Sequence, residues 1–249
     1  MALRNTLLIA GWALYVVAAQ HAHSADTVPG YPKDAVKLVV SYAAGNATDL
    51  FARTLADKLT AKWQKPVVVE NRAGAGGSLG AAFVAKSPPD GLTLLVTAVA
   101  AMAVNPHVYS RLGYDPLQDF DYVILAVWTP LVCVAPISFP ASTFAEFVKY
   151  TKERPGQTNF GSAGSGNIPH LTMETLKSRY GLNVVHVPYK ATASVLTDLV
   201  SARIQMACEP ASVTAPFIQS GKLKAIAVTS SKRLPVLPAT PTLDERRRY

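Results

Sequence analysis

The sequence predicts an α/β protein whose sheets are mainly parallel. Short runs of β-branched residues alternate with segments in which apolar residues recur every three or four positions, the spacing of one helix face. Strands that alternate with helices form right-handed βαβ units and therefore parallel sheets. Of the 249 residues, 49% are hydrophobic and only 16% are charged, which excludes an intrinsically disordered chain. This length suits one large domain or two lobes of ordinary size.

The first half of the chain is expected to form one lobe. Apolar, mostly β-branched or leucine-rich runs predict its strands at 36–41, 66–70 and 92–97. Between the first two strands, helical spacing places five residues on one face of a helix: Leu50, Phe51, Leu55, Leu59 and Trp63. A second helix is expected near 78–86. Two prolines and a glycine interrupt the alternation between 105 and 120, which indicates a crossover between lobes.

The second half continues the alternation. Strands are predicted near 122–127, 131–135, 158–161, 184–187 and 204–208, and helices near 143–153, 168–180 and 193–202. A further strand at 223–229 is expected to return to the first lobe. The predicted organisation is therefore a leader at 1–25, lobe 1 at 26–103, lobe 2 at 104–222, and a return to lobe 1 at 223–249.

The first 25 residues have the pattern of a secretory signal peptide. Arg4 is the only charged residue before Asp26, an apolar run extends from Leu7 to Ala19, and small residues follow it. A membrane-spanning helix needs about 20 apolar residues, so a membrane anchor is the weaker interpretation. His23 leaves the cleavage point open. The protein is therefore expected outside the cytoplasm, in the periplasm.

The two cysteines exclude a disulfide scaffold and a four-cysteine zinc site. In an oxidising compartment Cys133 and Cys208 can pair or stay reduced, and their spacing does not decide between the two. The basic balance, 24 Lys and Arg against 16 Asp and Glu, indicates anionic partners. Lys and Arg are scattered, without interleaved aromatic residues, so nucleic acid is not predicted.

Two glycine-containing turns each lead from a strand into a helix. One covers residues 42–49 and the other residues 161–170, with Asn46 and Asn167 as their expected helix N-caps. Such junctions present free N–H groups and the positive end of a helix dipole, and glycine lets a ligand approach the main chain. The pair therefore predicts two anion-binding turns facing each other across a cleft, with two ordinary structural turns as the alternative.

Catalytic and cofactor motifs are incomplete. The run Gly74-Ala-Gly-Gly-Ser-Leu-Gly80 lacks the third glycine of a dinucleotide fingerprint, because Leu79 stands in its place. Ser165 has glycines directly beside it, which is not the nucleophile-elbow spacing. Neither the histidines nor the cysteines have metal-site spacing. The sequence therefore predicts no cofactor, no metal and no catalytic residue.

Several longer motifs occur together, in order, along the whole mature chain. They are residues 36–49 (VKLVVSYAAGNATD), 69–77 (VENRAGAGG), 89–95 (PDGLTLL), 114–116 (YDP), 162–170 (SAGSGNIPH), 186–190 (HVPYK) and 221–230 (GKLKAIAVTS). With these motifs the sequence resembles Bug-type receptors, the extracytoplasmic solute-binding proteins of tripartite tricarboxylate transporters.

The resemblance implies a two-lobed periplasmic-binding-protein-like fold that closes on a small organic carboxylate. The ligand would pass to membrane permease subunits or to a sensor kinase. The competing hypothesis, a secreted hydrolase-like α/β enzyme acting on a small acidic substrate, needs a nucleophile–base pair that the sequence does not show. The residues that the resemblance assigns to ligand binding are Tyr42, Ala44, Gly45, Thr48, Asp49, Ser162, Gly164, Gly166, Asn167, His170 and Tyr189.

The sequence departs from the family pattern at several positions. Asn46 and Ala191 replace glycines, and Glu209-Pro210 replaces an Asp-Asn pair. Asp49 would repel a carboxylate, so it is interpreted as a helix cap or as a contact to a ligand amino group. Family members continue well past Asp244. The chain is therefore expected to be C-terminally truncated, with an incomplete first lobe and marginal stability.

Overall fold

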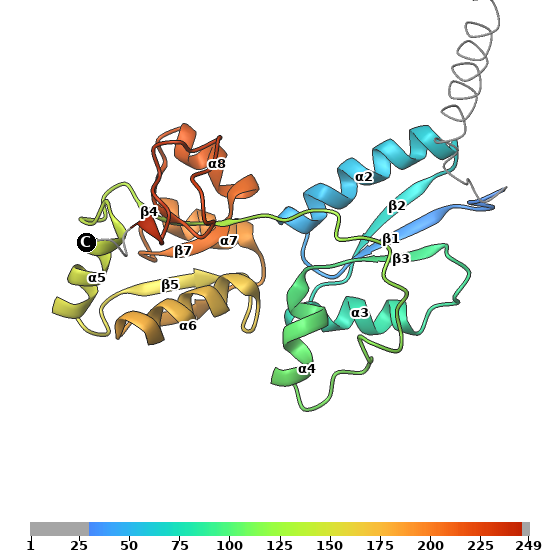
Figure 1. Ribbon diagram of the computed structural model, residues 1–249, viewed down its shortest axis with the longest axis horizontal. Helices are drawn as coiled ribbons and strands as arrows, with labels where there is room; N and C mark the ends of the chain where they lie inside the picture. Colours follow the sequence, from blue (N-terminus) through green and yellow to red (C-terminus); the bar gives the residue numbers. More distant parts are fainter. Residues whose placement is uncertain (1–29, 246–249) are drawn as a thin grey trace, which may run out of the picture.

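The computed structural model describes residues 30–245 and consists of two α/β lobes side by side (Figure 1). The predicted signal peptide and the basic run 246–248 lie outside the described residues. None of the helices in 30–245 is long and apolar enough to cross a membrane.

The first lobe is built on a parallel sheet with the strand order β2-β1-β3. The strands are β1 (Val36–Val40), β2 (Val67–Asn71) and β3 (Thr93–Val96). The helices are α2 (Ala47–Trp63), α3 (Ser78–Ala85) and the short α4 (Asn105–Val108), with a 3-10 turn η2 (Ala75–Gly77) before α3 and a π-helical turn η3 (Ala100–Val104) before α4.

The second lobe contains a mixed sheet of five strands. They are β4 (Leu131–Pro136), β5 (Asn159–Ser162), β6 (Val185–Pro188), β7 (Ala207–Pro210) and β8 (Leu223–Val228). β5 pairs with β6 in parallel, and a parallel bridge between Phe160 and Met206 joins β5 to the start of β7. β4 runs antiparallel to β7 and β8 on either side of it, so this sheet is less uniformly parallel than predicted.

Helices cover both faces of this second sheet. α5 (Phe144–Glu153) and α6 (Ile168–Tyr180) pack on one buried cluster, and α7 (Thr192–Val200) and α8 (Ala211–Gln219) pack on another. Cys133 and Cys208 occupy opposed positions on β4 and β7 and form a disulfide. This settles the pairing that the sequence left open.

The assignment of segments to lobes differs from the prediction in two places. β8 does not return to the first lobe, because it pairs with β4 along its whole length. Residues 104–120 stay with the first lobe. The amide of Asn105 donates to Gly76 O (3.1 Å) and Ser78 Oγ (2.8 Å), and the hydroxyl of Tyr114 donates to Ala101 O. These contacts hold α4 and the following loop against η2 and η3.

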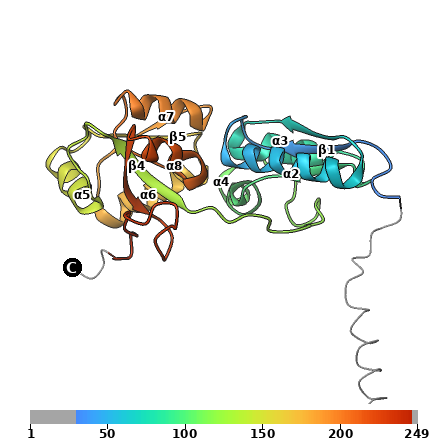
Figure 2. The same ribbon diagram turned by 90° about the horizontal axis from the view of Figure 1, so that it is seen from above.

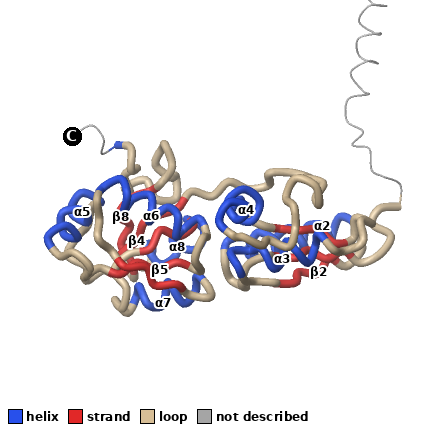
Figure 3. The backbone as a smooth tube through the Cα atoms, turned by 90° about the horizontal axis from the view of Figure 1, so that it is seen from below, coloured by secondary structure: helices blue, strands red, loops and turns tan. Residues whose placement is uncertain are grey.

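The strand predicted at 122–127 does not form. Residues 109–130 contain no helix or strand and connect the lobes as a continuous loop (Figure 3). Val123, Ile124 and Leu125 are 84%, 78% and 85% exposed, because no strand within 30–245 lies beside this run. Strand propensity alone therefore did not produce a strand.

Two helical predictions also need correction. α2 buries Ala52 and Ala56, and Leu55 and Trp63 pack against the same buried cluster as Ala56. Leu50 is 45% exposed, so only part of the predicted apolar face is buried. α4 and α8 were not predicted from the sequence. α8 contains Pro216, which in a sequence is typical of a helix end.

Candidate ligand-binding site

The two predicted turns lie on the sides of the lobes that face each other (Figures 1 and 2). Ala47, the first residue of α2, packs against the apolar cluster under α7 and α8 of the second lobe. A methyl group on Gly166 of the second turn would lie 3.9 Å from the hydroxyl of Tyr109, at the end of α4. The chain therefore brings both turns to the junction between the lobes.

The first turn is held by the carboxylate of Asp49, which is almost completely buried. Its Oδ2 accepts from the N–H of Gly45 (2.8 Å) and from Arg53 Nε (3.0 Å), and its Oδ1 accepts from the amide of Asn71 (2.8 Å). Burial raises the pKa of this carboxyl, but the hydrogen bonds from Arg53, Gly45 and Asn71 outweigh burial and leave the pKa below its usual value. Asp49 therefore holds the first turn in shape, and all of these hydrogen bonds come from residues of the first lobe.

The second turn is held by two histidines. The N–H of Gly166 donates to His170 Nδ1 (3.1 Å), which places the ring proton of His170 on Nε2. Ser162 Oγ lies 2.8 Å from His186 Nε2 and donates to the carbonyl of Gly164 (3.0 Å). Because Ser162 uses its proton on Gly164, His186 Nε2 is the donor to Ser162.

The two turns follow the same plan around their helix N-termini. In each, an asparagine N-cap accepts a 2.9 Å hydrogen bond from the N–H of the third helical residue, Asp49 or His170. The side chain of that third residue then accepts from the glycine just before the cap. The expected caps Asn46 and Asn167 are confirmed. This arrangement differs from the usual capping box. The side chains of Asp49 and His170 accept from the N–H of the residue before the N-cap, whereas in a capping box the third helical residue accepts from the N–H of the N-cap itself.

This plan leaves main-chain donors available at each turn. Within residues 30–245, the N–H groups of Ala47 and Thr48 at the start of α2 make no hydrogen bond. The same holds for Ala163, Gly164 and Ser165 in the second turn. Unsatisfied N–H groups at a helix N-terminus form a site that favours an anion. The N–H groups of Gly45 and Gly166, by contrast, are already occupied.

The two tyrosines in the predicted site have hydroxyls that are already engaged. The hydroxyl of Tyr42 donates to Gly76 O (3.3 Å), and the hydroxyl of Tyr189 donates to Asp198 Oδ2 (2.8 Å). Burial raises the pKa of Tyr42 to about 12. Burial, followed by the bond to Asp198, raises that of Tyr189 to about 12. Each is neutral near pH 7, and neither hydroxyl proton is free to orient a ligand.

The remaining predicted residues line the surface of the turns. Ala44 and Gly45 are exposed, Thr48 is half-buried, and Asn167 and Ser162 are buried. Gly45 has a φ of +82°, Gly164 of +118° and Gly166 of +80°, a backbone region that favours glycine. The substituted residue Asn46 has a φ of −84° and Ala191 a φ of −150°, so neither departure from the family pattern strains the backbone.

The glycine run after β2 serves packing. A Cβ on Gly80 would lie 2.7 Å from Ser41 Cα, and a Cβ on Gly77 would lie 3.1 Å from the Tyr42 hydroxyl. These glycines let α3 approach β1 closely and enclose the Tyr42 ring. No group of three or more His, Cys, Asp or Glu side chains within residues 30–245 is arranged to hold a metal ion.

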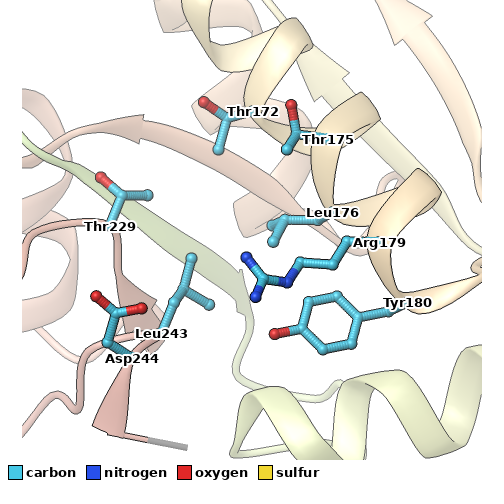
Figure 4. Close-up of a pocket in the computed structure, with 8 residues that line it drawn as sticks. All are labelled: Thr172, Thr175, Leu176, Arg179, Tyr180, Thr229, Leu243 and Asp244. Atoms are coloured by element: carbon cyan, nitrogen blue, oxygen red, sulfur yellow. The ribbon is translucent and has the colours of Figure 1, made fainter. Parts of the chain in front are cut away.

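A cavity of about 240 Å³ lies elsewhere in the second lobe (Figure 4). Residues of α6, including Thr172, Leu176 and Arg179, line it together with Thr229 and Leu243. It extends toward the C-terminal end of α6, whereas both turns lie at helix N-termini. We therefore do not assign it to the site.

Sequence reasoning missed two residues at this junction. Tyr109 was not singled out, because only the packing of α4 against lobe 1 brings it near Gly166. His186 was not among the predicted site residues, yet its side chain contacts the second turn through Ser162. The sequence signal that was available for His186 is its place as the first residue of the motif 186–190, which also contains Tyr189.

Comparison with known proteins assigns the chain to a class of receptor. A family model described as the tripartite tricarboxylate transporter family receptor matches residues 51–248. The chain belongs to this family, so the resemblance seen in the sequence is confirmed. The family is one of solute-binding receptors, which leaves the hydrolase alternative without support, and its periplasmic members place the chain in the periplasm.

Individual relatives cover most of this chain. It is 37% identical over 221 residues to a UPF0065 protein of Agrobacterium vitis from the TAR-I ttuE-ttuC' intergenic region, and covers 64% of that protein's length. The structure of the periplasmic binding protein BugD shares 37% identity and a TM-score of 0.81, covering 87% of this chain and 72% of BugD. The structure of R. palustris Rpa4515 with adipate shares 33% identity and a TM-score of 0.84, covering 86% and 72%. The chain thus spans roughly two thirds to three quarters of these relatives.

Proposed function

We propose that this protein is a periplasmic receptor that captures a small organic dicarboxylate between its two lobes. One observation carries the proposal: each lobe presents a helix N-terminus with unbonded main-chain N–H groups, and both lie at the lobe junction. Backbone donors and helix dipoles stabilise a carboxylate without burying an unpaired positive side chain. Two such turns suit a ligand with a carboxylate at each end.

The chemistry of the surroundings supports a dianion. Asp49 carries a negative charge, but its ion pair with Arg53 (3.0 Å) and the hydrogen bond from Asn71 satisfy that charge inside the lobe. The second turn contains no acidic residue, and the whole chain has a formal net charge of +8. The adipate bound to Rpa4515 is a dicarboxylate of this kind.

The ligand would act by favouring the closed arrangement of the lobes over the open one. In this proposal the closed receptor is recognised by the membrane permease subunits of a tripartite transporter or by a sensor kinase. Those subunits would discriminate the closed form from the open one by the relative placement of the two lobes. The ligand-binding residues are those of the two turns, with Tyr42 and Tyr189 as apolar walls.

Isothermal titration calorimetry of the purified protein with a panel of acids tests the proposal. The panel should contain succinate, malate, adipate and citrate, with acetate and lysine as controls, at pH 7.5. We expect one-to-one binding of at least one dicarboxylate and no binding of lysine. A sample that unfolds cooperatively but binds no acid of the panel would refute the receptor function for this chain.

A further inference from the structure

We propose that His186 is a positioning residue for the second turn, and that His170, which stacks on it, makes ligand binding sensitive to acid. His186 holds Gly164 through Ser162, and His170 holds Gly166 directly. This inference rests on the proposed function, because it concerns the turn that would bind the carboxylate. Nothing in the sequence or the family resemblance assigns His186 to the site.

The geometry gives His186 one defined role. The hydroxyl of Ser162 is buried, and it both accepts from His186 and donates to the carbonyl of Gly164. Gly164 has a φ of +118°, in a region where glycine has wide conformational freedom, and this bond fixes the direction of its carbonyl. Without the donor at His186, Ser162 is free to rotate its proton away from Gly164.

The two histidines also depend on each other. Their rings stack with centroids 4.0 Å apart, and the ring of Phe160 stacks on His186 at 4.8 Å. Two imidazolium cations at this separation would repel strongly, so the stack requires at least one neutral ring. The neutral form of His170 is the one that accepts from Gly166, because a protonated Nδ1 has no lone pair.

The charged groups around the pair all come from α6. Glu174 lies 3.7 Å from His170 Nε2, and Lys177 lies 2.8 Å from Glu174. β5 contributes only Phe160 and Ser162, which carry no charge. Burial, then the neighbouring His170, lowers the pKa of His186 to about 4, with Glu174 opposing and Lys177 adding to the shift. Burial lowers the pKa of His170 in the same way.

These shifts define the pH range of the effect. Both rings are neutral at pH 7, so the second turn is intact there. On acidification His170 becomes protonated below its usual pKa of 6.5, and His186 becomes protonated near pH 4. Protonation of His170 removes the acceptor of the Gly166 N–H, whereas protonated His186 still donates from Nε2 to Ser162, so affinity for the dicarboxylate falls as His170 is protonated, below pH 6.5.

The test compares two substitutions at position 186. His186→Gln keeps an N–H donor near the place of Nε2 and does not titrate, whereas His186→Leu keeps the bulk and removes the donor. At pH 7.5 we expect His186→Gln to bind within about threefold of the wild type and His186→Leu to bind about tenfold more weakly, the effect of one lost hydrogen bond. The exposed His107, changed to Gln, is the matched control and should bind like the wild type.

The pH profile separates positioning from simple support of the fold. Acidification from pH 7.5 to pH 4.5 protonates the ligand equally in every sample. The ratio of wild-type to variant affinity at each pH therefore reports only changes in the protein. We expect the wild type to lose about threefold to tenfold more affinity over this range than His170→Asn, whose Oδ1 lies near the place of Nδ1, accepts from Gly166 and does not titrate. Equal pH profiles, or a His186→Leu variant that binds like the wild type, would overturn the inference.

A readout without ligand keeps this inference distinct from the proposed function. In the NMR spectrum of the unliganded protein, the amide resonances of Gly164 and Gly166 should follow the histidine titration between pH 7 and pH 4. In His170→Asn the shift of Gly166 should shrink. If the wild-type resonances stay in place over this range, the inference fails even where a dicarboxylate binds. If they move but no acid binds, only the proposed function fails.

Discussion

The two turns share one hydrogen-bonding arrangement but use different acceptors, a carboxylate in the first lobe and an imidazole in the second. In the first lobe the third helical residue is Asp49, paired with Arg53 one turn later. In the second lobe it is His170, and the residue one turn later is Glu174. Both side chains accept from the preceding glycine, but one is a carboxylate that stays charged and the other is a base that must stay neutral.

The difference shows how a protein can build an anion site from an acidic and a basic residue alike. Asp49 has its charge satisfied by Arg53, Gly45 and Asn71, so the first turn tolerates acid down to the lowered pKa of that carboxyl. The second turn has no fixed charge to hold it and depends on His170 staying neutral so that Nδ1 can accept from Gly166. The first lobe is therefore the acid-resistant half of the site and the second the acid-sensitive half.

The largest effect is expected from charge placed in the first turn. Gly45→Asp adds a carboxylate to the proposed anion-binding turn, at an exposed position where a Cβ meets no atom within 4 Å. A like charge about 5 Å away costs about 3 kcal/mol at an effective dielectric of 20, so we expect affinity to fall by at least about 100-fold. Calorimetry with a dicarboxylate measures the change.

Gly156→Asp is the control for Gly45→Asp. Gly156 has a similar φ of +76° and equally open surroundings, but it lies outside both turns. Gly156→Asp carries the same backbone strain as Gly45→Asp but places no charge at the site. The affinity of this control for the dicarboxylate should therefore match that of the wild type. If both variants bound equally well, the first turn would not be part of the site.

The next largest effect is expected when the anchor of the first turn is removed. Asp49→Ala leaves the N–H of Gly45, the amide of Asn71 and the guanidinium of Arg53 without their shared acceptor. The loss of charge-assisted bonds should lower the free energy of unfolding by about 2–4 kcal/mol in urea titrations. Asp57→Ala, an exposed position on the same helix, should change it by less than about 0.5 kcal/mol. Equal losses would contradict the anchoring role.

Exchanging the chemistry of the turns sharpens the comparison. His170→Asp places a carboxylate beside Glu174 without a neighbour equivalent to Arg53, and we expect about tenfold weaker binding at pH 7.5. His170→Asp combined with Glu174→Arg rebuilds the Asp–Arg pair of the first lobe and should recover most of that loss. The double variant should also lose less affinity at pH 5 than the wild type. A double variant no better than the single one would show that the two turns are not equivalent.

The smallest effect concerns Glu209, a fully buried carboxyl in the second lobe. Burial raises its pKa to about 8, and the hydroxyl of Thr192 donates to Oε2 (3.2 Å). Because the folded pKa lies above the unfolded value of 4.5, the wild type should lose stability as pH rises from about 4.5 through 8. Glu209→Gln should remove this slope and raise the melting temperature at pH 8.5 by a few °C, with little change at pH 5. A melting temperature that depends on pH equally in both proteins would argue against a buried neutral Glu209.

Local patterns in the sequence predicted much of the fold and of the turns. The caps Asn46 and Asn167, the helix at 168–180 and the strands of the first lobe follow from neighbouring residues, which a sequence displays directly. The partner of β8 and the place of α4 depend on contacts between distant segments, so propensity could not assign them to a lobe. The acceptor roles of Asp49 and His170 and the stacking of His186 depend on side-chain geometry. A sequence contains no signal for these beyond the residue types.

The most direct test of the account is whether one ligand depends on both turns. A dicarboxylate that binds the wild type at pH 7.5 should be titrated into Gly45→Asp, Gly164→Asp and the double variant, each shown to be folded by circular dichroism. If the two turns hold the two ends of one ligand, each single substitution abolishes binding and the double variant is no worse. If either single variant keeps wild-type affinity, the ligand is held by one lobe alone and the account is wrong.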